Sequence, residues 1–404
     1  MLDWLLIWGL ILAPMTALRI YKFGPGELLL IAWMLGVLVE NKRSTETRGR
    51  VSVKLNSISI YQVANLVFMF VGMLVNLLLY KEIKGFSTIF TTFFSHAFMF
   101  LFVVQLFRYF EKRSTADINR LLSKLVVRGV TTYVILLLYS ELINESLFGI
   151  KLWMGGHSRF LGLALNPHQI AMITGAGVFL ALYLSSEAIL VKKKVLYISV
   201  AGLWFLVSLS TKSDTMTLCY VICLTYIVFM KFVKIGSERK SSGYRDYLTM
   251  MALGIMAVLI VSPLLFGLLS NFVSTAGNGL GRMKLWQSAF GELIEKPIGF
   301  LVGLGPGGNT GYIMTTGSEA EAHNTYVQLC LNSGILICLF YVYSIGGIIK
   351  KPFYKNIYLV SAVLFFLLYG IGGNMNRRVL VWFTYAVCAI LFEKKAEEER
   401  ALIR

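Results

Sequence analysis

Charged residues are scarce in this sequence. They make up 15% of the 404 residues, whereas hydrophobic residues make up 57%. A soluble domain carries roughly a quarter charged residues, so the composition excludes a soluble globular protein. The few charges gather in short polar stretches, which separate apolar runs of about the length that crosses a bilayer, roughly 17–25 residues. The sequence therefore predicts an all-α, polytopic membrane protein.

Cysteine-rich and nucleotide-binding motifs are also lacking. The five cysteines all lie inside apolar runs, which excludes a disulfide framework and a cysteine-ligated metal site. A phosphate loop needs a glycine-rich turn followed by Lys and Ser or Thr at the start of a helix. The glycine-rich stretch 303–308 has no such lysine. We expect it to be a turn; the alternative is a nest of backbone N–H groups that binds an anion.

Twelve apolar runs are predicted to span the membrane. No soluble domain boundary is visible, so we expect residues 1–404 to form one integral membrane domain. The N-terminus lacks a basic segment and a small-residue cleavage site, which indicates a retained first span and not a removed signal. The predicted spans are 2–18, 26–40, 58–80, 86–107, 124–140, 168–190, 195–210, 215–233, 247–269, 324–349, 356–372 and 378–392.

The net charge of +17 is concentrated in alternate polar segments. These segments contain 26 of the 38 Lys and Arg residues, and they all lie on the cytoplasmic side if twelve spans place both termini in the cytoplasm. This is the positive-inside pattern of membrane proteins, and it argues against nucleic acid as a partner. The basic segments are 41–54, 108–128, 192–194, 231–245, 350–355 and the tail 393–404.

The opposite, external side has two long segments, 141–167 and 270–322. Long loops are commonly functional or disordered, and the second is too rich in apolar residues to be disordered. Within it, residues 280–295 are predicted to form an amphipathic helix on the membrane surface or against the helix bundle. The predicted apolar stripe consists of Met283, Trp286, Phe290 and Leu293, with Arg282, Lys284 and Glu292 off the stripe.

The external side also holds two arginines and a histidine of interest. His323 stands where the second long segment re-enters the membrane, and histidine is a natural general base at neutral pH; the alternative is a polar cap of a span. Arg159 and Arg282 have guanidinium groups that bind phosphate bidentately; the alternative is an ordinary headgroup contact. Together these residues favour an anionic, phosphate-bearing lipid as substrate.

Three further cations lie in short external turns. Lys212 lies in the turn 209–215, where the alternative is an ion pair with Asp214. Arg377 and Arg378 form a basic pair just before the last predicted span. Charged residues so close to a bilayer are costly unless they are paired or functional. We therefore include all three cations among the candidate phosphate-binding residues.

Four segments together resemble the O-antigen ligase and polysaccharide polymerase family, the Wzy/WaaL-type membrane glycosyltransferases. Residues 159–171 (RFLGLALNPHQIA) are similar to the family's Arg-x-x-Gly-x-x-x-Asn-Pro-Asn-x-x-Ala segment. Residues 280–286 resemble its Arg-x-x-x-Trp helix, and residues 297–305 its Pro-x-x-Gly-x-Gly turn. Residues 323–334 resemble its His-Asn-x-x-Leu-x-x-x-x-x-Gly signature. The four segments occur in the family's order, and the resemblance covers roughly residues 150–350.

The resemblance implies metal-independent glycosyl transfer, without a cofactor, at the outer face of the bacterial cytoplasmic membrane. It implies a donor oligosaccharide linked to undecaprenyl diphosphate, with membrane lipid and other polysaccharide-assembly proteins as further partners. Arg159 and Arg282 would hold the diphosphate, and His323 would deprotonate or orient the acceptor hydroxyl. Two departures are visible: Lys212 stands where the family often has Arg, and His168 stands where it has the second Asn.

We expect a polymerase that joins the repeat units of an O-antigen, capsule or exopolysaccharide. A ligase of the same family, which moves the finished glycan to a lipid, protein or wall acceptor, is the nearest alternative because it shares the donor and the chemistry. A lipid-linked oligosaccharide flippase or transporter is the alternative from another class. A transporter places ionisable groups mid-membrane around a central cavity, whereas this sequence places them at the external interface, which favours the enzyme.

Single cysteines at two positions test this orientation. In a cysteine-free background, a membrane-impermeant thiol reagent added to intact cells is expected to label Ser274→Cys, which lies in the external segment 270–322, and not Ser241→Cys, which lies in a cytoplasmic segment. The reverse labelling pattern would place the candidate residues on the cytoplasmic side and would contradict the predicted topology.

Overall fold

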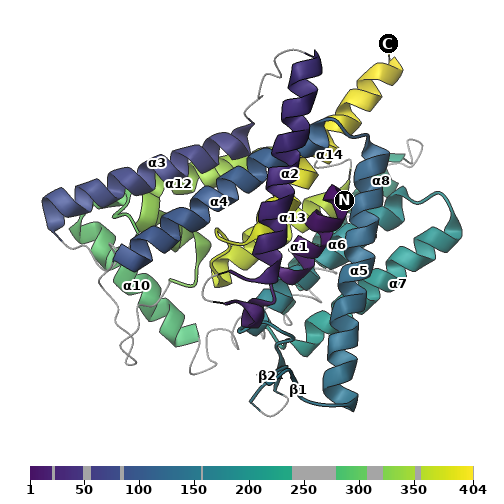
Figure 1. Ribbon diagram of the computed structural model, residues 1–404, viewed down its shortest axis with the longest axis horizontal. Helices are drawn as coiled ribbons and strands as arrows, with labels where there is room; N and C mark the ends of the chain where they lie inside the picture. Colours follow the sequence, from purple (N-terminus) through teal and green to yellow (C-terminus); the bar gives the residue numbers. More distant parts are fainter. Residues whose placement is uncertain are drawn as a thin grey trace.

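The computed structural model describes residues 1–20, 23–48, 56–81, 86–155, 158–238, 279–306, 322–350 and 356–403. These residues are nearly all helical (Figure 1). Seven of the helices are long and apolar enough, by length and composition, to cross a membrane. The described residues thus form an all-α, multi-pass membrane protein, which is the fold class that the composition predicts.

The seven candidate spans are α3 (Ser57–Val75) with its continuation η2 (Asn76–Tyr80), α4 (Phe86–Glu111), α5 (Thr115–Leu142), α6 (Pro167–Glu187), α7 (Val191–Ser210), α8 (Asp214–Glu238) and α12 (Thr325–Lys350). The other helices are α1 (Leu2–Leu12), η1 (Thr16–Leu18), α2 (Pro25–Arg48), α10 (Gly279–Glu295), α11 (Pro297–Val302), α13 (Ile357–Gly372) and α14 (Val379–Ile403). Two small antiparallel hairpins pair β1 (Ser146–Leu147) with β2 (Ile150–Lys151), and β3 (Trp153–Met154) with β4 (Arg159–Phe160).

Eleven of the twelve predicted spans coincide with helices, and the remaining one, 247–269, lies outside the described residues. The number of spans therefore stays a prediction. α1 ends at Leu12 and not at residue 18, because Pro14 cannot donate a backbone hydrogen bond and the chain turns through η1. α2 continues to Arg48, and the charged tail continues α14, so parts of two predicted polar segments are helical.

α10 coincides with the helix predicted at 280–295, and within the predicted stripe Leu293 is buried and Trp286 is half-buried. Met283 and Phe290 are exposed. The side that packs against α11 and α12 includes Glu292, which is buried because its carboxylate accepts a hydrogen bond from Lys296 Nζ at 3.1 Å. This ion pair allows a charged residue to share the apolar side. The apolar residues buried beside it are Leu285, Ala289 and Leu293.

The connections between helices gather on two opposite sides of the molecule. On one side, the backbone N–H of Ala17 donates to the carbonyl of Leu163 (3.0 Å), which joins the α1–α2 and α5–α6 connections. On the other side, Lys395 Nζ pairs with Glu187 at 2.6 Å and joins α14 to the end of α6. Figure 1 shows the β1–β2 hairpin at the bottom and the C-terminus at the top. The loop face is hereafter the side formed by the α1–α2, α5–α6, α7–α8 and α13–α14 connections and the start of α12.

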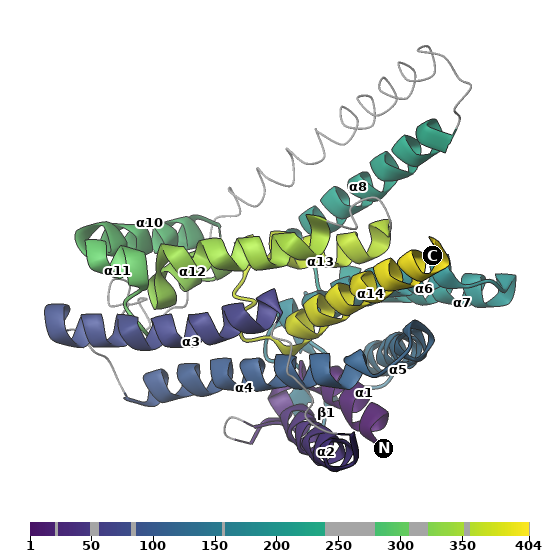
Figure 2. The same ribbon diagram turned by 90° about the horizontal axis from the view of Figure 1, so that it is seen from above.

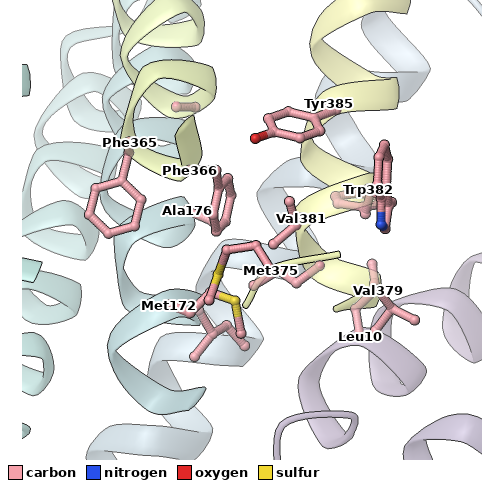
Figure 3. Close-up of a cluster of buried hydrophobic side chains, with 14 of the residues drawn as sticks. Leu10, Met172, Ala176, Phe365, Phe366, Met375, Val379, Val381, Trp382 and Tyr385 are labelled. Carbon is pink, nitrogen blue, oxygen red and sulfur yellow. The ribbon is translucent and has the colours of Figure 1, made fainter. Parts of the chain in front are cut away.

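α6 is the central helix of the bundle. In its most apolar 18-residue stretch 89% of the residues are buried, whereas the share in the corresponding stretch of α3 is 22%. Glycine allows its close packing on α7, because a Cβ at Gly177 would lie 2.5 Å from the Trp204 ring. This tight packing fixes the start of α6 at the loop face. Figure 3 shows the apolar cluster around it, with Met172 and Ala176 from α6, Phe365 and Phe366 from α13, and Trp382 and Tyr385 from α14.

Glycines also allow backbone contact between the turn after α11 and α12. Gly303 (φ +90°) and Gly334 (φ +83°) both adopt the left-handed region, and α12 unwinds at the second. The backbone N–H of Leu304 donates to the carbonyl of Leu331 at 2.7 Å. The described part of the predicted glycine-rich turn is therefore a turn, held between α3 and α12, which lie side by side in Figure 2.

A buried polar cluster lies beside this joint. His96 stands alone among apolar residues of its span, which predicts a buried, hydrogen-bonded side chain, and this prediction is confirmed. Asn65 Nδ2 donates to His96 Nδ1 at 3.1 Å, and Ser333 Oγ donates to Asn65 Oδ1 at 2.7 Å. The cluster ties α3, α4 and α12 together, and it places Ser333 directly before the unwound Gly334.

Replacing Gly334 by Ala is expected to destabilise the protein strongly. A Cβ there would lie 2.1 Å from Leu301 O, on a backbone with φ +83°. Backbone overlap and strain together cost about 3 kcal/mol or more. Thermal unfolding in detergent can be followed with a thiol-reactive dye, because all five cysteines are free and buried.

Gly346→Ala in the same helix is the matched control. Nothing lies within 4 Å of a Cβ at Gly346, and Ala has the higher helix propensity. Its Tm is expected to equal or slightly exceed that of the unmodified protein. Equal Tm values for the two variants would contradict a role for the joint.

Candidate functional site

Arg159 is held against the α7–α8 turn. It lies on β4, and the β3–β4 hairpin is anchored by the buried rings of Trp153 and Phe160, whose centroids are 5.4 Å apart. Arg159 Nε donates to the carbonyl of Thr211 at 2.9 Å. No other hydrogen bond of this guanidinium is formed within the part of the chain that the structure describes, so its two terminal nitrogens remain for another acceptor.

The α7–α8 turn presents Lys212 outward. Its side chain is exposed, whereas the neighbouring Thr211 and Ser213 are buried. The alternative ion pair between Lys212 and Asp214 is not among the ion pairs of the described residues. The backbone of Lys212 is left-handed, with φ +45°. Left-handed residues other than glycine are strained, and such strain is concentrated at functional sites.

His168 links three elements of the loop face. The Asn166 side chain caps α6 by accepting from the backbone N–H of His168 at 2.9 Å, and Pro167 occupies the first helical position, where proline is favoured. His168 Nδ1 lies 3.1 Å from the Tyr369 hydroxyl and 3.3 Å from Ser213 Oγ. The start of α6 is thereby connected to α13 and to the α7–α8 turn.

Arg377 and Arg378 line a cavity of about 1170 Å³ in the loop face. A third arginine, Arg19, also lines it and forms an ion pair with Glu27. The loop that carries the arginine pair is fixed by Thr325, whose Oγ1 donates to Gly373 O at 2.8 Å and accepts from Met375 N at 2.9 Å. The rest of the lining is mainly apolar, with aromatic residues Phe23, Phe90, Phe94 and Phe98.

Burial and neighbouring positive charges act on both arginines of the pair. Burial, and then the charge of Arg378, lowers the pKa of Arg377 to about 10. Burial, and then the charge of Arg19, lowers the pKa of Arg378, against smaller opposing effects of Tyr369 and Glu27. Both guanidinium groups stay protonated at neutral pH. The cavity therefore has an excess of positive charge in a partly desolvated place, which favours an anionic ligand.

His323 lies at the start of α12, beside α10. Its side chain is exposed and its backbone is left-handed, with φ +47°. On one side of it, Trp286 Nε1 donates to the carbonyl of Ala322 at 2.8 Å. On the other side, Asn324 Oδ1 accepts from the backbone N–H of Tyr326 at 2.9 Å and caps α12. These contacts dock α10, the helix that carries Arg282, next to His323; the Arg282 side chain lies outside the described part of the structure.

The structure gathers the predicted residues into two neighbouring groups. Arg159 and Lys212 meet at the α7–α8 turn, and Arg377 and Arg378 meet at the cavity. Three residues that complete these groups are absent from the sequence-based candidates: Arg19 and Glu27 at the cavity, and Tyr369 beside His168. The sequence could have indicated Arg19, because it is a cation outside the basic cytoplasmic segments and directly follows the first predicted span. Tyr369 lies within an apolar run, and nothing in its spacing marks it.

Histidine and carboxylate side chains near the candidate residues are the possible ligands of a metal ion. Within the described ranges, no group of three or more His, Cys, Asp or Glu side chains is arranged to hold a metal ion. His157, Glu319 and Glu321 lie outside those ranges. Metal independence stays a prediction.

Comparison with protein-family models gives no match to this sequence, and neither does comparison with curated proteins. The resemblance to a glycosyltransferase family therefore depends on the four short segments that carry it. The geometry of the loop face provides a separate line of argument, because it brings cations together that are distant in sequence.

Arg378→Gln is expected to raise the thermal stability of the protein at pH 7. The pKa of Arg378 is lower in the folded protein than in the unfolded chain, so the charged form is less favourable when folded, and a neutral side chain removes that penalty. For its neighbour Arg377, the corresponding penalty is complete below pH about 10 and is lost only as the pH rises further, toward the pKa of an arginine in the unfolded chain. Arg120→Gln is the control, because Arg120 is 72% exposed. A lower Tm for Arg378→Gln would show that its charge stabilises the fold.

Proposed function

We propose that this protein is a membrane glycosyltransferase that polymerises lipid-diphosphate-linked oligosaccharide repeat units at the outer face of the bacterial cytoplasmic membrane. The observation that carries the proposal is the cavity in the loop face, which combines three arginines with an aromatic wall. A lipid diphosphate has the complementary chemistry, a multiply charged anion on an apolar chain. The motif resemblance of the four segments supports the same substrate class.

The proposed reaction transfers a glycan from one lipid diphosphate to a sugar hydroxyl on another lipid-linked unit. The hydroxyl oxygen forms a bond with the anomeric carbon, the bond between that carbon and the diphosphate oxygen breaks, and the diphosphate leaves with the electron pair. The proton of the hydroxyl passes to a base. Stabilising the departing diphosphate is an electrostatic task, which fixed cations perform well in a water-poor site.

The candidate residues divide into those that bind the diphosphates of the lipid-linked substrates and one that takes up the proton. Arg159, Arg282, Lys212, Arg377 and Arg378 are the proposed diphosphate-binding residues, and His323 is the proposed base for the acceptor hydroxyl. The Arg159 geometry supports its part, because the Nε bond to Thr211 orients the guanidinium and leaves its terminal nitrogens for a phosphate. The strained backbone and exposure of His323 support a functional position and not a buried structural one.

His323→Asn tests the proposed base more sharply than His323→Ala. Asn tolerates a left-handed backbone better than Ala does, so it preserves the turn at φ +47° while it removes the imidazole. Loss of general-base catalysis is expected to lower the rate about 10²–10⁴-fold. The measurement is polymer formation from purified lipid-linked repeat units in a reconstituted membrane.

The activity of His323→Asn distinguishes a chemical role of His323 from a structural one. Near-normal activity of His323→Asn would contradict the role of His323 as a base. Product analysis in the same assay separates the polymerase from the ligase: a ladder of repeat units supports the polymerase, whereas single transfer to an added lipid or wall acceptor would identify a ligase. Transport of the lipid-linked unit across the membrane without any new glycosidic bond would contradict both.

A further inference from the structure

A row of hydrogen-bonding side chains lies beside one of the two groups of cations at the loop face. Arg159 and Lys212 are not among the residues that line the cavity. His168 lies beside the turn of Lys212, with its Nδ1 3.3 Å from Ser213 Oγ and 3.1 Å from the Tyr369 hydroxyl. Tyr369 lies on α13, the helix that precedes the loop of Arg377 and Arg378. The loop face therefore has two separate groups of cations.

The cavity carries an excess of positive charge. Arg19, Arg377 and Arg378 are opposed by one carboxylate among the lining residues, that of Glu27. Glu27 is engaged with Arg19 and with the backbone N–H of Gly24 at 3.0 Å. The Arg378 guanidinium forms no hydrogen bond or ion pair with any residue that the structure describes. A half-buried guanidinium without an acceptor is costly, and an anion in the cavity would remove that cost.

One wall of the cavity is aromatic and reaches the outside of the bundle. Phe90, Phe94 and Phe98 follow one another at helical spacing along α4. Phe90 is 60% exposed and Phe94 is 44% exposed, and the ring of Phe23 meets that of Phe94 edge-on at 5.8 Å. Because α4 is a candidate membrane span, this exposed row faces lipid. An apolar chain can therefore leave the cavity sideways into the bilayer.

We infer that the cavity of Arg19, Arg377 and Arg378 binds a second lipid diphosphate, with the phosphates at the arginines and the apolar chain along Phe98, Phe94 and Phe90. Its volume of about 1170 Å³ exceeds the roughly 300–1,000 Å³ of ordinary small-molecule pockets, so it has room for a headgroup with attached sugars. The acceptor role of this lipid rests on the proposed function, because a polymerase joins two lipid-linked molecules and must hold both. The binding itself does not depend on that function.

The test is a binding measurement on the full-length protein in nanodiscs. The probe is a radiolabelled polyprenyl diphosphate, and the ligand bound per protein is counted at saturation. Two sites are expected. Arg378→Ala is expected to weaken one of them about tenfold or more, and Arg159→Ala the other, since each loses charge-assisted hydrogen bonds. Arg120→Ala, on the side opposite the loop face, is the matched control and is expected to keep both sites.

Two further binding measurements test whether the ligand needs its apolar chain. Inorganic pyrophosphate is expected to bind the Arg378 site at least about tenfold more weakly than the polyprenyl form, because it lacks the apolar chain. Phe94→Ala is expected to weaken the polyprenyl form and to leave pyrophosphate binding unchanged. Phe94 is partly exposed, so its removal leaves the fold intact.

Each outcome decides between the possibilities. A single site that Arg378→Ala does not affect, or equal affinity for pyrophosphate and the polyprenyl form at the Arg378 site, would overturn the inference. Two sites with the expected dependence, in a protein that makes no polymer, would support the second lipid site and would contradict only the proposed function. Polymer formation by a protein whose Arg378→Ala variant still binds two lipids would contradict only the second site.

Discussion

Backbone hydrogen bonding inside a bilayer is the constraint on which the rest of this structure depends. A peptide group in hydrocarbon must find its partner within the protein, so the chain crosses as helices and its irregular segments collect at the two sides. The unwound turn of α12 is an exception within a candidate span. There the carbonyl of Leu331 accepts from Leu304, so the interrupted ladder is completed by the turn after α11. Only glycine at 303 and 334 lets these backbones come so close.

The loop face gathers cations at a cost in stability. Desolvation and mutual repulsion lower the pKa of Arg377 and of Arg378, which means that the fold would be more stable without their charges. Stability is commonly given up in this way where function requires it. A bound diphosphate would reverse the balance, because it supplies the negative charge that the single carboxylate of Glu27 does not. The same electrostatic imbalance that lowers the stability of the folded protein therefore strengthens the binding of an anion in the cavity.

The sequence predicts the helices better than it predicts the site. Long apolar runs determine where a helix must lie, so all but one predicted span coincide with described helices. The burial of Glu292 on α10 could not be predicted from apolar spacing, since it depends on the pairing of its carboxylate with Lys296. The sequence motifs identify Arg159 and His323 individually and do not indicate which residues lie near them in space. That Arg19 joins Arg377 and Arg378 depends on packing between the α1–α2 connection and the start of α14, which no local pattern records.

The departure from the family motif at His168 coincides with the contact that joins the two groups of cations. An imidazole Nδ1 within 3.3 Å of Ser213 Oγ and 3.1 Å of the Tyr369 hydroxyl connects the turn of Lys212 to the helix that leads into Arg378. Three elements thus meet at one ring, and the start of α6 beneath it is held by the Asn166 cap and by the buried packing of the helix. This support fixes the position of His168 relative to the turn of Lys212 and to α13. A reaction between two bound lipids gains most of its rate from such fixed proximity, so the residue that departs from the motif is well placed to set the spacing of the proposed donor and acceptor.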